Sequence, residues 1–289
     1  MITPAFIPSP PSNGFSIGPL FFHAYGIAYV VAVAVAIWIV RRRWARDGGD
    51  SDLVYNVVWW GFPAGLVGGR IYFDITTPSQ MPKHWWGPFA IWDGGMGIWG
   101  GVALGVAVGV WYLRRHLSKA DTYRFINAAA PSLLVAQAIG RIGNYFNQEL
   151  FGKPSTLPWA LEISPIHRPP GYLRFATFQP TFLYELIWDL AFAGFLIWLN
   201  RDRRIRPPGL FPLYIAGYSA FRIYEETLRI DYSQYILGMR LNFWVAIIGT
   251  IAGLVWFALI QFRGKPRGSG GGEDPQAATS SAYSESQAG

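Results

Sequence analysis

Residues 128–149 read AAAPSLLVAQAIGRIGNYFNQE, an apolar run that ends in an arginine, two asparagines and a glutamate. The apolar part, 128–140, has the composition of a membrane-spanning helix, and the polar side chains follow directly at its end. Charged groups at membrane depth are energetically costly and usually mark function. The stretch therefore predicts a membrane protein with functional groups at the end of one of its helices.

The composition of the whole chain supports a membrane protein with several spans. The chain has 289 residues and is 52% hydrophobic and 17% aromatic. Only 14% of its residues are charged, against about 25% in soluble domains. The 14 Trp and 15 Tyr suit the headgroup layer of a bilayer, where amphipathic rings collect.

Several kinds of chemistry are excluded by residues that the chain lacks. It has no cysteine, which excludes disulfides, cysteine-ligated metals and a thiol nucleophile of its own. No glycine fingerprint for a nucleotide is present. The four histidines are far apart and show no metal-binding spacing: His23, His84, His116 and His167. The residues therefore predict neither a metal site nor a nucleotide site.

Seven apolar segments are long enough to cross a bilayer, for which a helix needs about 20 residues. These segments are 17–40, 53–74, 94–113, 124–146, 178–199, 208–228 and 241–262. The predicted fold class is an all-α polytopic membrane protein with seven transmembrane helices, which together form one domain over residues 1–263.

Lysine and arginine are concentrated in alternate connections between these segments. Four basic residues follow the first span, four the third, four the fifth and three the seventh. Basic connections face the cytoplasm, so this alternation predicts an external N-terminus and a cytoplasmic C-terminus. Topology thus accounts for the net charge of +7, and we expect no nucleic-acid partner.

Three segments lie outside the predicted spans. Residues 148–177 are rich in proline and aromatics and are expected to form a small extracytoplasmic head segment. Residues 264–289 are rich in Gly, Ser and Ala and are expected to be a disordered cytoplasmic tail. Residues 1–16 lack the basic start of a signal peptide, so the first span is expected to be retained.

The polar cluster at the end of the fourth span has two interpretations. Arg141, Asn144 and Gln148 would share one face if the helix continued, with Glu149 and Gly152 just beyond it. The cluster would then offer paired donors to a phosphate or another anion. The alternative is a helix end capped by asparagine, with a structural Arg–Glu pair. The spacing supports both equally.

A second polar stripe lies on the sixth span. Tyr218, Arg222, Glu226 and Arg229 are spaced by four, four and three residues. A second intramembrane arginine beside the first would suit a divalent anion. In the alternative, Arg222 and Glu226 neutralise each other at i,i+4 and Arg229 reaches the interface by snorkelling. The glutamates of this region are sufficient to neutralise every intramembrane arginine: Glu149, Glu185, Glu225 and Glu226.

Three further features of the sequence are weaker evidence of function when each is taken by itself. The glycines of 94–101 allow either close helix packing or approach of a ligand. Arg70 is another intramembrane cation, with Asp74 available as a partner at i,i+4. His23 and Tyr25 lie at the start of the first span, where such residues commonly belong to the interfacial belt.

Taken together, the motifs resemble the signatures of the bacterial phosphatidylglycerol–prolipoprotein diacylglyceryl transferases. The resemblance covers about residues 17 to 262. Its motifs, in the family order, are His23-Ala-Tyr25-Gly, Val67-Gly-Gly-Arg70, Gly94-Gly-Met-Gly-Ile-Trp-Gly-Gly101, Arg141-Ile-Gly-Asn-Tyr-Phe-Asn-Gln-Glu149, Gln179-Pro-Thr-Phe-Leu-Tyr-Glu185 and Phe221-Arg222 with Glu226 and Arg229.

The resemblance implies a multi-pass enzyme of the bacterial inner membrane with its active site towards the outer leaflet. Such an enzyme moves the diacylglyceryl group of phosphatidylglycerol to the lipobox cysteine thiol of a prolipoprotein signal peptide and releases glycerol phosphate, without a cofactor. The nucleophile belongs to the substrate, so an enzyme without cysteine is compatible with this chemistry.

The resemblance also implies roles for individual residues. Arg141 and Arg222 would stabilise the charge that develops on the leaving phosphate. Asn144 and Glu149 would position the headgroup and the arginines, and Tyr25 would line the headgroup pocket. Further substrate-binding positions carried over from the family are Arg70, Trp99, Gly100, Gly152, Tyr218, Glu226 and Arg229.

Two positions depart from the family pattern. Many members have a histidine, often proposed as the base for the thiol, where this chain has Trp99, which cannot accept a proton. An aspartate common early in the fourth span is Asn127 here. Two alternatives stay open at this stage: a transporter or flippase of an anionic lipid or solute, and a non-catalytic lipoprotein-binding relative.

Overall fold

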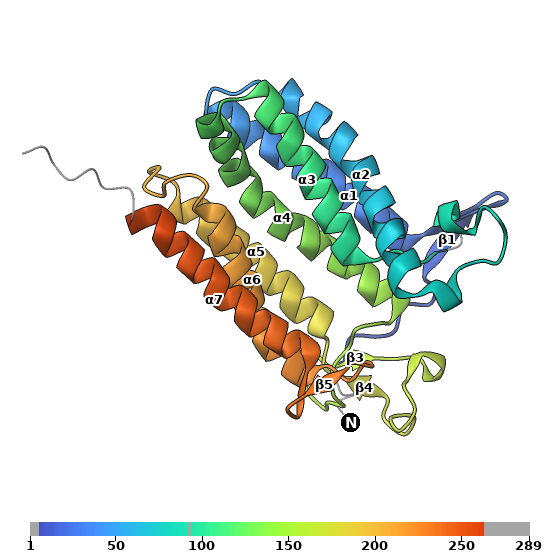
Figure 1. Ribbon diagram of the computed structural model, residues 1–289. Coiled ribbons are helices and arrows are strands. Elements are labelled where there is room, and N and C mark those ends of the chain that lie inside the picture. The colour runs from blue at the N-terminus through green and yellow to red at the C-terminus, as the bar shows by residue number, and fades with distance from the viewer. Residues whose placement is uncertain (1–5, 92–93, 263–289) are drawn as a thin grey trace, which may run out of the picture.

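Seven α-helices form an elongated bundle in the computed structural model, which describes residues 6–91 and 94–262 (Figure 1). Within these ranges the helices other than α1 begin and end close to the predicted spans. They are α1 (Ala24–Arg46), α2 (Asp52–Thr76), α3 (Ile98–His116), α4 (Lys119–Asn147), α5 (Thr181–Leu199), α6 (Leu210–Leu228) and α7 (Leu241–Phe262).

The central helix of the bundle is α4, which packs against α1, α3, α5 and α6. Ser118 caps its start by accepting a hydrogen bond from the backbone N–H of Asp121 at 3.1 Å. Small buried residues, among them Ala130 and Ala138, let its neighbours approach closely. The helix ends at Asn147, so it delivers the polar end of the opening stretch to a position beside α5 and α6.

Helices α2 and α3 pack through glycines, which confirms the packing interpretation of the glycine-rich segment. A Cβ added to Gly100 would lie 2.2 Å from the carbonyl oxygen of Gly68. A Cβ added to Gly68 would lie 2.4 Å from the carbonyl oxygen of Gly100. Only glycine at both positions allows the two backbones to approach this closely.

The two ends of the bundle differ in character. The short connections α1–α2, α3–α4 and α5–α6 lie at one end together with the last turn of α7 (Figure 1). At this basic end Arg203 forms an ion pair with Asp47 at 3.2 Å and so joins two connections. The opposite end carries the longer connections and three short β-ribbons, and we call it the ribbon end.

Each β-ribbon is a pair of antiparallel strands. The pairs are β1 (Gly14–Ile17) with β2 (Leu20–His23), β3 (Leu161–Glu162) with β4 (Thr177–Phe178), and β5 (Tyr235–Ile236) with β6 (Met239–Arg240). The 3₁₀ turns are η1 (Pro78–Gln80), η2 (Gly87–Phe89) and η4 (Pro165–His167). The fold is thus mostly helical, with small ribbons that the expectation of an all-α protein did not include.

The first helix begins later than predicted. The apolar residues 17–22 place the predicted start of the first span at residue 17, but residues 17–23 form part of the β1–β2 hairpin. Gly18 adopts a φ of 58°, in the left-handed region that favours glycine, and Pro19 follows it in the turn. The helix α1 consequently begins at Ala24, and His23 precedes it.

The segment between α4 and α5 is held together by an apolar cluster. The cluster contains Phe151, Leu161, Ile163, Phe178 and Phe182. The N-terminal segment joins it, because the backbone of Ile7 hydrogen-bonds to Ala160 and Glu162.

Four helices of the described residues are long and apolar enough to cross a membrane: α1, α4, α5 and α7. This finding supports a multi-pass membrane protein. For α2, α3 and α6 the crossing stays a prediction. The tail predicted at 264–289 lies outside the described residues.

Candidate active site

The two arginines singled out by the sequence share one carboxylate. Arg141 on α4 and Arg222 on α6 both contact Glu185 on α5. The distances are 2.5 Å from Arg141 Nη2 to Glu185 Oε1 and 3.4 Å from Arg222 Nη1 to Glu185 Oε2. Glu185 is fully buried, so this three-helix contact lies inside the bundle.

Arg141 begins a chain of hydrogen bonds that leads to the ribbon end. Its Nη1 donates to Asn144 Oδ1 at 3.2 Å, and Asn144 Nδ2 donates to Glu149 Oε1 at 2.8 Å. Asn147 Nδ2 donates to the same oxygen at 3.3 Å. The ion pair of Arg141 is therefore with Glu185 from another helix, while Glu149 binds the two asparagine amides.

Gln148 does not share the helix face of Arg141. The helix α4 ends one residue earlier, and Gln148 adopts a left-handed φ of 51°. Its Oε1 accepts a hydrogen bond from the backbone N–H of Ser164 at 2.7 Å. Gln148 thus connects the helix end to the segment between α4 and α5, which corrects the spacing argument for this residue.

Arg222 is held by acids of its own helix, so the alternative in which Arg222 pairs with Glu226 at i,i+4 is the one found here. Its Nη1 lies 2.6 Å from Glu225 Oε2, and its Nη2 forms a short contact with Glu226. Glu226 also accepts a hydrogen bond from Arg240 Nε at 2.7 Å. Arg240 lies at the end of β6, and no spacing in the sequence relates it to the site.

Arg229 does not snorkel to the interface. Its Nε donates to Asp231 Oδ1 at 2.7 Å, and its side chain is only 7% exposed. Arg240 Nη2 lies 2.9 Å from the other oxygen of Asp231. Burial raises the pKa of Asp231, but the hydrogen bond from Arg229 and the charges of Arg229 and Arg240 together hold that pKa below its ordinary value.

The ionic cluster is balanced in charge. It contains four arginines and four acids: Arg141, Arg222, Arg229, Arg240, Glu185, Glu225, Glu226 and Asp231. A guanidinium has five N–H donors, and the hydrogen bonds of Arg141 to side chains of the described residues use its Nη1 and Nη2. Arg141 therefore keeps donors for a further anion.

Two tyrosines flank the arginines. The ring of Tyr25 packs on Gly143, where an added Cβ would lie 2.4 Å from the ring. The tyrosine on α1 thereby lies beside the turn of α4 that carries Arg141 and Asn144. Tyr218 lies one turn before Arg222 and packs against the apolar cluster between α4, α5 and α6.

Other predicted site residues have structural contacts elsewhere. Arg70 is buried and lies 3.1 Å from Asp74, as its spacing predicted. Its guanidinium also donates to five backbone carbonyls of the α2–α3 connection, those of Gly87, Pro88, Ala90, Gly94 and Gly95. Arg70 thus fixes the path of that connection.

The structure also gives the positions of Trp99 and Gly152. Trp99 lies in the first turn of α3 and is 60% exposed. Gly152 pairs with Arg229 in an isolated antiparallel bridge, and its N–H donates to the carbonyl of Gln179 at 2.9 Å. A Cβ at Gly152 would lie 2.9 Å from the side chain of Gln179, so glycine lets the chain pass between the ends of α5 and α6.

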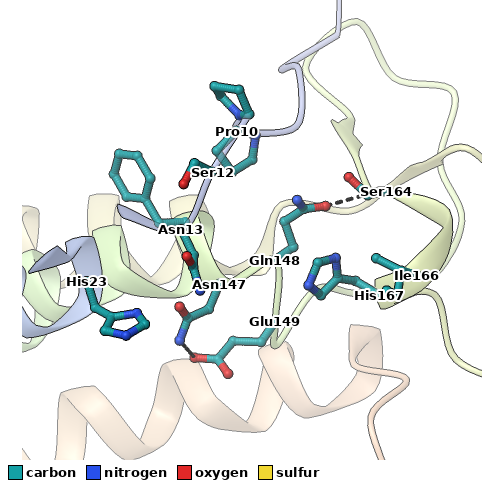
Figure 2. Close-up of a pocket in the computed structure, with 12 residues that line it drawn as sticks. Pro10, Ser12, Asn13, His23, Asn147, Gln148, Glu149, Ser164, Ile166 and His167 are labelled. Atoms are coloured by element: carbon teal, nitrogen blue, oxygen red, sulfur yellow. Dashed lines mark hydrogen bonds between the residues drawn. The ribbon is translucent and has the colours of Figure 1, made fainter. Parts of the chain in front are cut away.

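Two cavities lie beside the end of α4. The first, which we call the outer pocket, has a volume of about 680 Å³ and contains Asn147, Gln148 and Glu149 in its wall (Figure 2). The second has a volume of about 340 Å³ and an apolar wall between β1, α1 and α4. Both cavities are lined by Phe146, so a polar space adjoins an apolar one. Among the described residues, no group of three or more His, Asp or Glu is arranged to hold a metal ion.

Comparisons with known proteins identify the family. The family model described as prolipoprotein diacylglyceryl transferase matches residues 13–259. The chain is 42% identical over 258 residues to phosphatidylglycerol–prolipoprotein diacylglyceryl transferase 2 of Streptomyces coelicolor, with 87% of this chain and 80% of that protein covered. It is 40% identical over 280 residues to the phosphatidylglycerol–prolipoprotein diacylglyceryl transferase of Bifidobacterium adolescentis, covering 91% and 82%. This chain therefore belongs to the prolipoprotein diacylglyceryl transferase family.

Proposed function

We propose that this protein transfers the diacylglyceryl group of phosphatidylglycerol to the lipobox cysteine thiol of prolipoproteins and releases glycerol phosphate. The observation that carries the proposal is the convergence of Arg141 and Arg222, from two helices, on one buried carboxylate. Membership of the family and the names of the relatives support the same reaction.

The arginine pair suits the charge that develops in this reaction. The substrate thiolate attacks a glycerol carbon, the carbon–oxygen bond breaks, and a phosphodiester with one negative charge becomes a phosphate monoester with more. Fixed donors in a site that excludes water stabilise such developing charge strongly. Arg141 and Arg222 would share the phosphate, while Glu185 keeps the two guanidinium groups at a fixed separation before the lipid binds.

The two adjoining cavities suit an amphiphilic substrate. The polar outer pocket and the apolar cavity meet at Phe146, next to the helix turn that carries Arg141. We place the glycerol headgroup on the polar side and part of an acyl chain on the apolar side. Asn144 and Glu149 would hold Arg141 in place, and Tyr25 would close the headgroup space over Gly143.

The remaining family positions have supporting roles in this proposal. Glu226 and Arg229 hold Arg222 and the α6–α7 connection through Arg240 and Asp231. Tyr218 borders the arginine pair from α6. Three positions act by shaping the backbone: Arg70, Gly100 and Gly152. The exposed Trp99 would contact the substrate from the first turn of α3.

We further propose that all seven helices cross the bacterial inner membrane with the basic end in the cytoplasm. The connections at that end carry most of the arginine and lysine, as the positive-inside rule requires. The ribbon end would then face outwards, so the N-terminus would be external and the active site would lie towards the outer leaflet.

Transfer is tested with purified protein in phosphatidylglycerol vesicles and a synthetic lipobox peptide. Mass spectrometry should show a thioether-linked diacylglyceryl peptide, with release of glycerol phosphate in equal amount. Appearance of lipid in the other leaflet without this product would support a flippase instead. No product from well-folded protein would contradict the proposed function.

The arginine roles are tested by Arg141→Lys and Arg222→Lys. Each keeps a positive charge but loses the paired donors, and we expect kcat/KM to fall by about 100-fold or more, as for loss of a transition-state donor. The matched control is Arg168→Lys at the same end of the bundle, whose guanidinium donates to backbone carbonyls of Ile163 and Leu173. Full activity in either site variant would contradict its assigned role.

A further inference from the structure

The thiol of the substrate must lose its proton before it can attack. A cysteine thiol with a pKa near 8.5 is mostly protonated at neutral pH, so an acceptor placed beside it accelerates the reaction. Trp99 cannot accept this proton, because its indole N–H is only a donor. The arginines carry no lone pair for a proton either, so the acceptor belongs to another group.

The outer pocket contains two imidazoles that are far apart in the sequence. His23 comes from the end of β2, directly before α1, and His167 from the end of η4 between α4 and α5. In Figure 2 both rings lie at the pocket wall, and Asn147 and Glu149 lie between them. Only the folded chain brings these side chains together, 144 positions apart (23 to 167) in sequence.

The pocket is joined to the arginine pair by hydrogen bonds. Glu149 lines the pocket and accepts from Asn144, which in turn accepts from Arg141. A group in the pocket is therefore separated from Arg141 by two side chains of the same helix end. A sulfur atom delivered through the pocket would reach the lipid headgroup from its polar side.

Both imidazoles are available for proton transfer. Within the part of the chain that the structure describes, no side-chain hydrogen bond occupies a ring nitrogen of His23 or His167, and both residues are exposed. His116, by contrast, is bound to the carbonyl of Tyr112 through Nδ1 at 2.9 Å and lies at the basic end. His84 stacks on Trp86 in the α2–α3 connection.

We propose that the outer pocket receives the lipobox cysteine and that its imidazoles, His23 and His167, accept the thiol proton. This inference rests on the proposed transfer reaction. The S–H bond breaks and the proton passes to an imidazole nitrogen, while the thiolate forms the S–C bond to the glycerol carbon. The C–O bond breaks, its electron pair leaves on glycerol phosphate, and the imidazolium then returns its proton to that phosphate or to water.

The test combines a double variant with two nucleophiles. His23→Gln together with His167→Gln removes both acceptors but keeps side chains that can hydrogen-bond. Transfer to a cysteine peptide should fall by about 100-fold, the usual contribution of a general base. With a selenocysteine peptide, the double variant should transfer lipid at nearly the rate of the wild-type protein, because a selenol is already ionised at neutral pH and needs no base. The control double variant, His84→Gln with His116→Gln, should match wild type with both peptides.

Two results would overturn the inference. One is an unchanged rate of the pocket double variant with the cysteine peptide. The other is an equal loss with both peptides, which would assign the histidines to folding or peptide binding. Failure of the proposed function gives a different result, because wild-type protein would then transfer lipid to neither peptide.

Discussion

At the scale of single residues, Glu185 determines how the site is built. It is the one acid of the cluster that comes from α5, and it contacts the arginines of both α4 and α6. Each buried charge would be costly alone, and the mutual pairing of the cluster compensates that cost. The residue therefore sets both the separation of the arginines and the neutrality of the site.

We expect Glu185→Gln to destabilise the protein and to abolish most transfer activity. The change keeps the shape of the side chain but leaves Arg141 without an acid in direct contact, and breaking a buried pair typically costs about 3–5 kcal/mol. The free energy of unfolding in detergent and the transfer rate measure the two effects. Asp189→Asn is the control, since Asp189 lies one turn further along α5, is buried, and accepts no hydrogen bond from the described residues. Equal stability of the two variants would show that Glu185 has no special role.

At the scale of elements, two kinds of contact hold α2 and α3 together. Glycines allow the helices to pack backbone against backbone, and Arg70 ties their connection to α2 through carbonyl groups. Both kinds of contact involve residues to which the family resemblance assigns substrate binding. Their contacts give them a structural role in addition to any role in binding.

Gly100→Ala should destabilise the protein by about 1–3 kcal/mol, the usual cost of overpacking. The added methyl would overlap the carbonyl oxygen of Gly68, and backbone cannot move aside as a side chain can. Gly194→Ala in α5 has nothing within 4 Å of the new Cβ and should be neutral or slightly stabilising. The melting temperatures of the two variants, measured by thermal unfolding in the same detergent, compare their stabilities. A shared melting temperature would contradict close packing of α2 on α3.

Arg70→Lys should loosen the connection between α2 and α3. A lysine offers three donors from a single atom and cannot reach carbonyls on several sides as the planar guanidinium does. Limited proteolysis should then cut residues 77–91 faster than in wild type, while cutting of the α5–α6 connection stays unchanged. Equal protection of 77–91 in both proteins would show that Arg70 does not hold this segment.

At the scale of the whole molecule, charge and shape divide the bundle into a basic end and a ribbon end. The arginine pair, the outer pocket and the apolar cavity all adjoin the C-terminal half of α4. This half of the helix points towards the ribbon end (Figure 1). This polarity would let a lipid of the outer leaflet and an exported peptide reach the same place. It also makes the orientation in the membrane directly testable.

Because the chain has no cysteine, single cysteines report topology without background. Thr156→Cys at the ribbon end should react with a membrane-impermeant maleimide in intact cells. Asp202→Cys at the basic end should react only after the membrane is permeabilised. Both residues are exposed, so access to the reagent depends only on the side of the membrane. The reverse pattern would place the active site on the cytoplasmic side.

The sequence by itself determined the membrane class, the approximate positions of the helices and the residues of the two polar motifs. These depend on hydropathy, on charge along the chain and on spacing within one helix, which are local properties. The pairs Arg70–Asp74 and Arg222–Glu226 were predictable for the same reason.

Only the tertiary structure decided which acid Arg141 pairs with, where Arg240 lies and which histidines share a pocket. Glu185, Arg240 and His167 come from segments whose positions depend on how helices pack and connections fold back. Hydropathy predicts too early a start for α1, because a hairpin with apolar residues and a membrane span cannot be told apart by hydropathy. Contacts between distant segments depend on packing, which no local pattern encodes, and the site is made of such contacts.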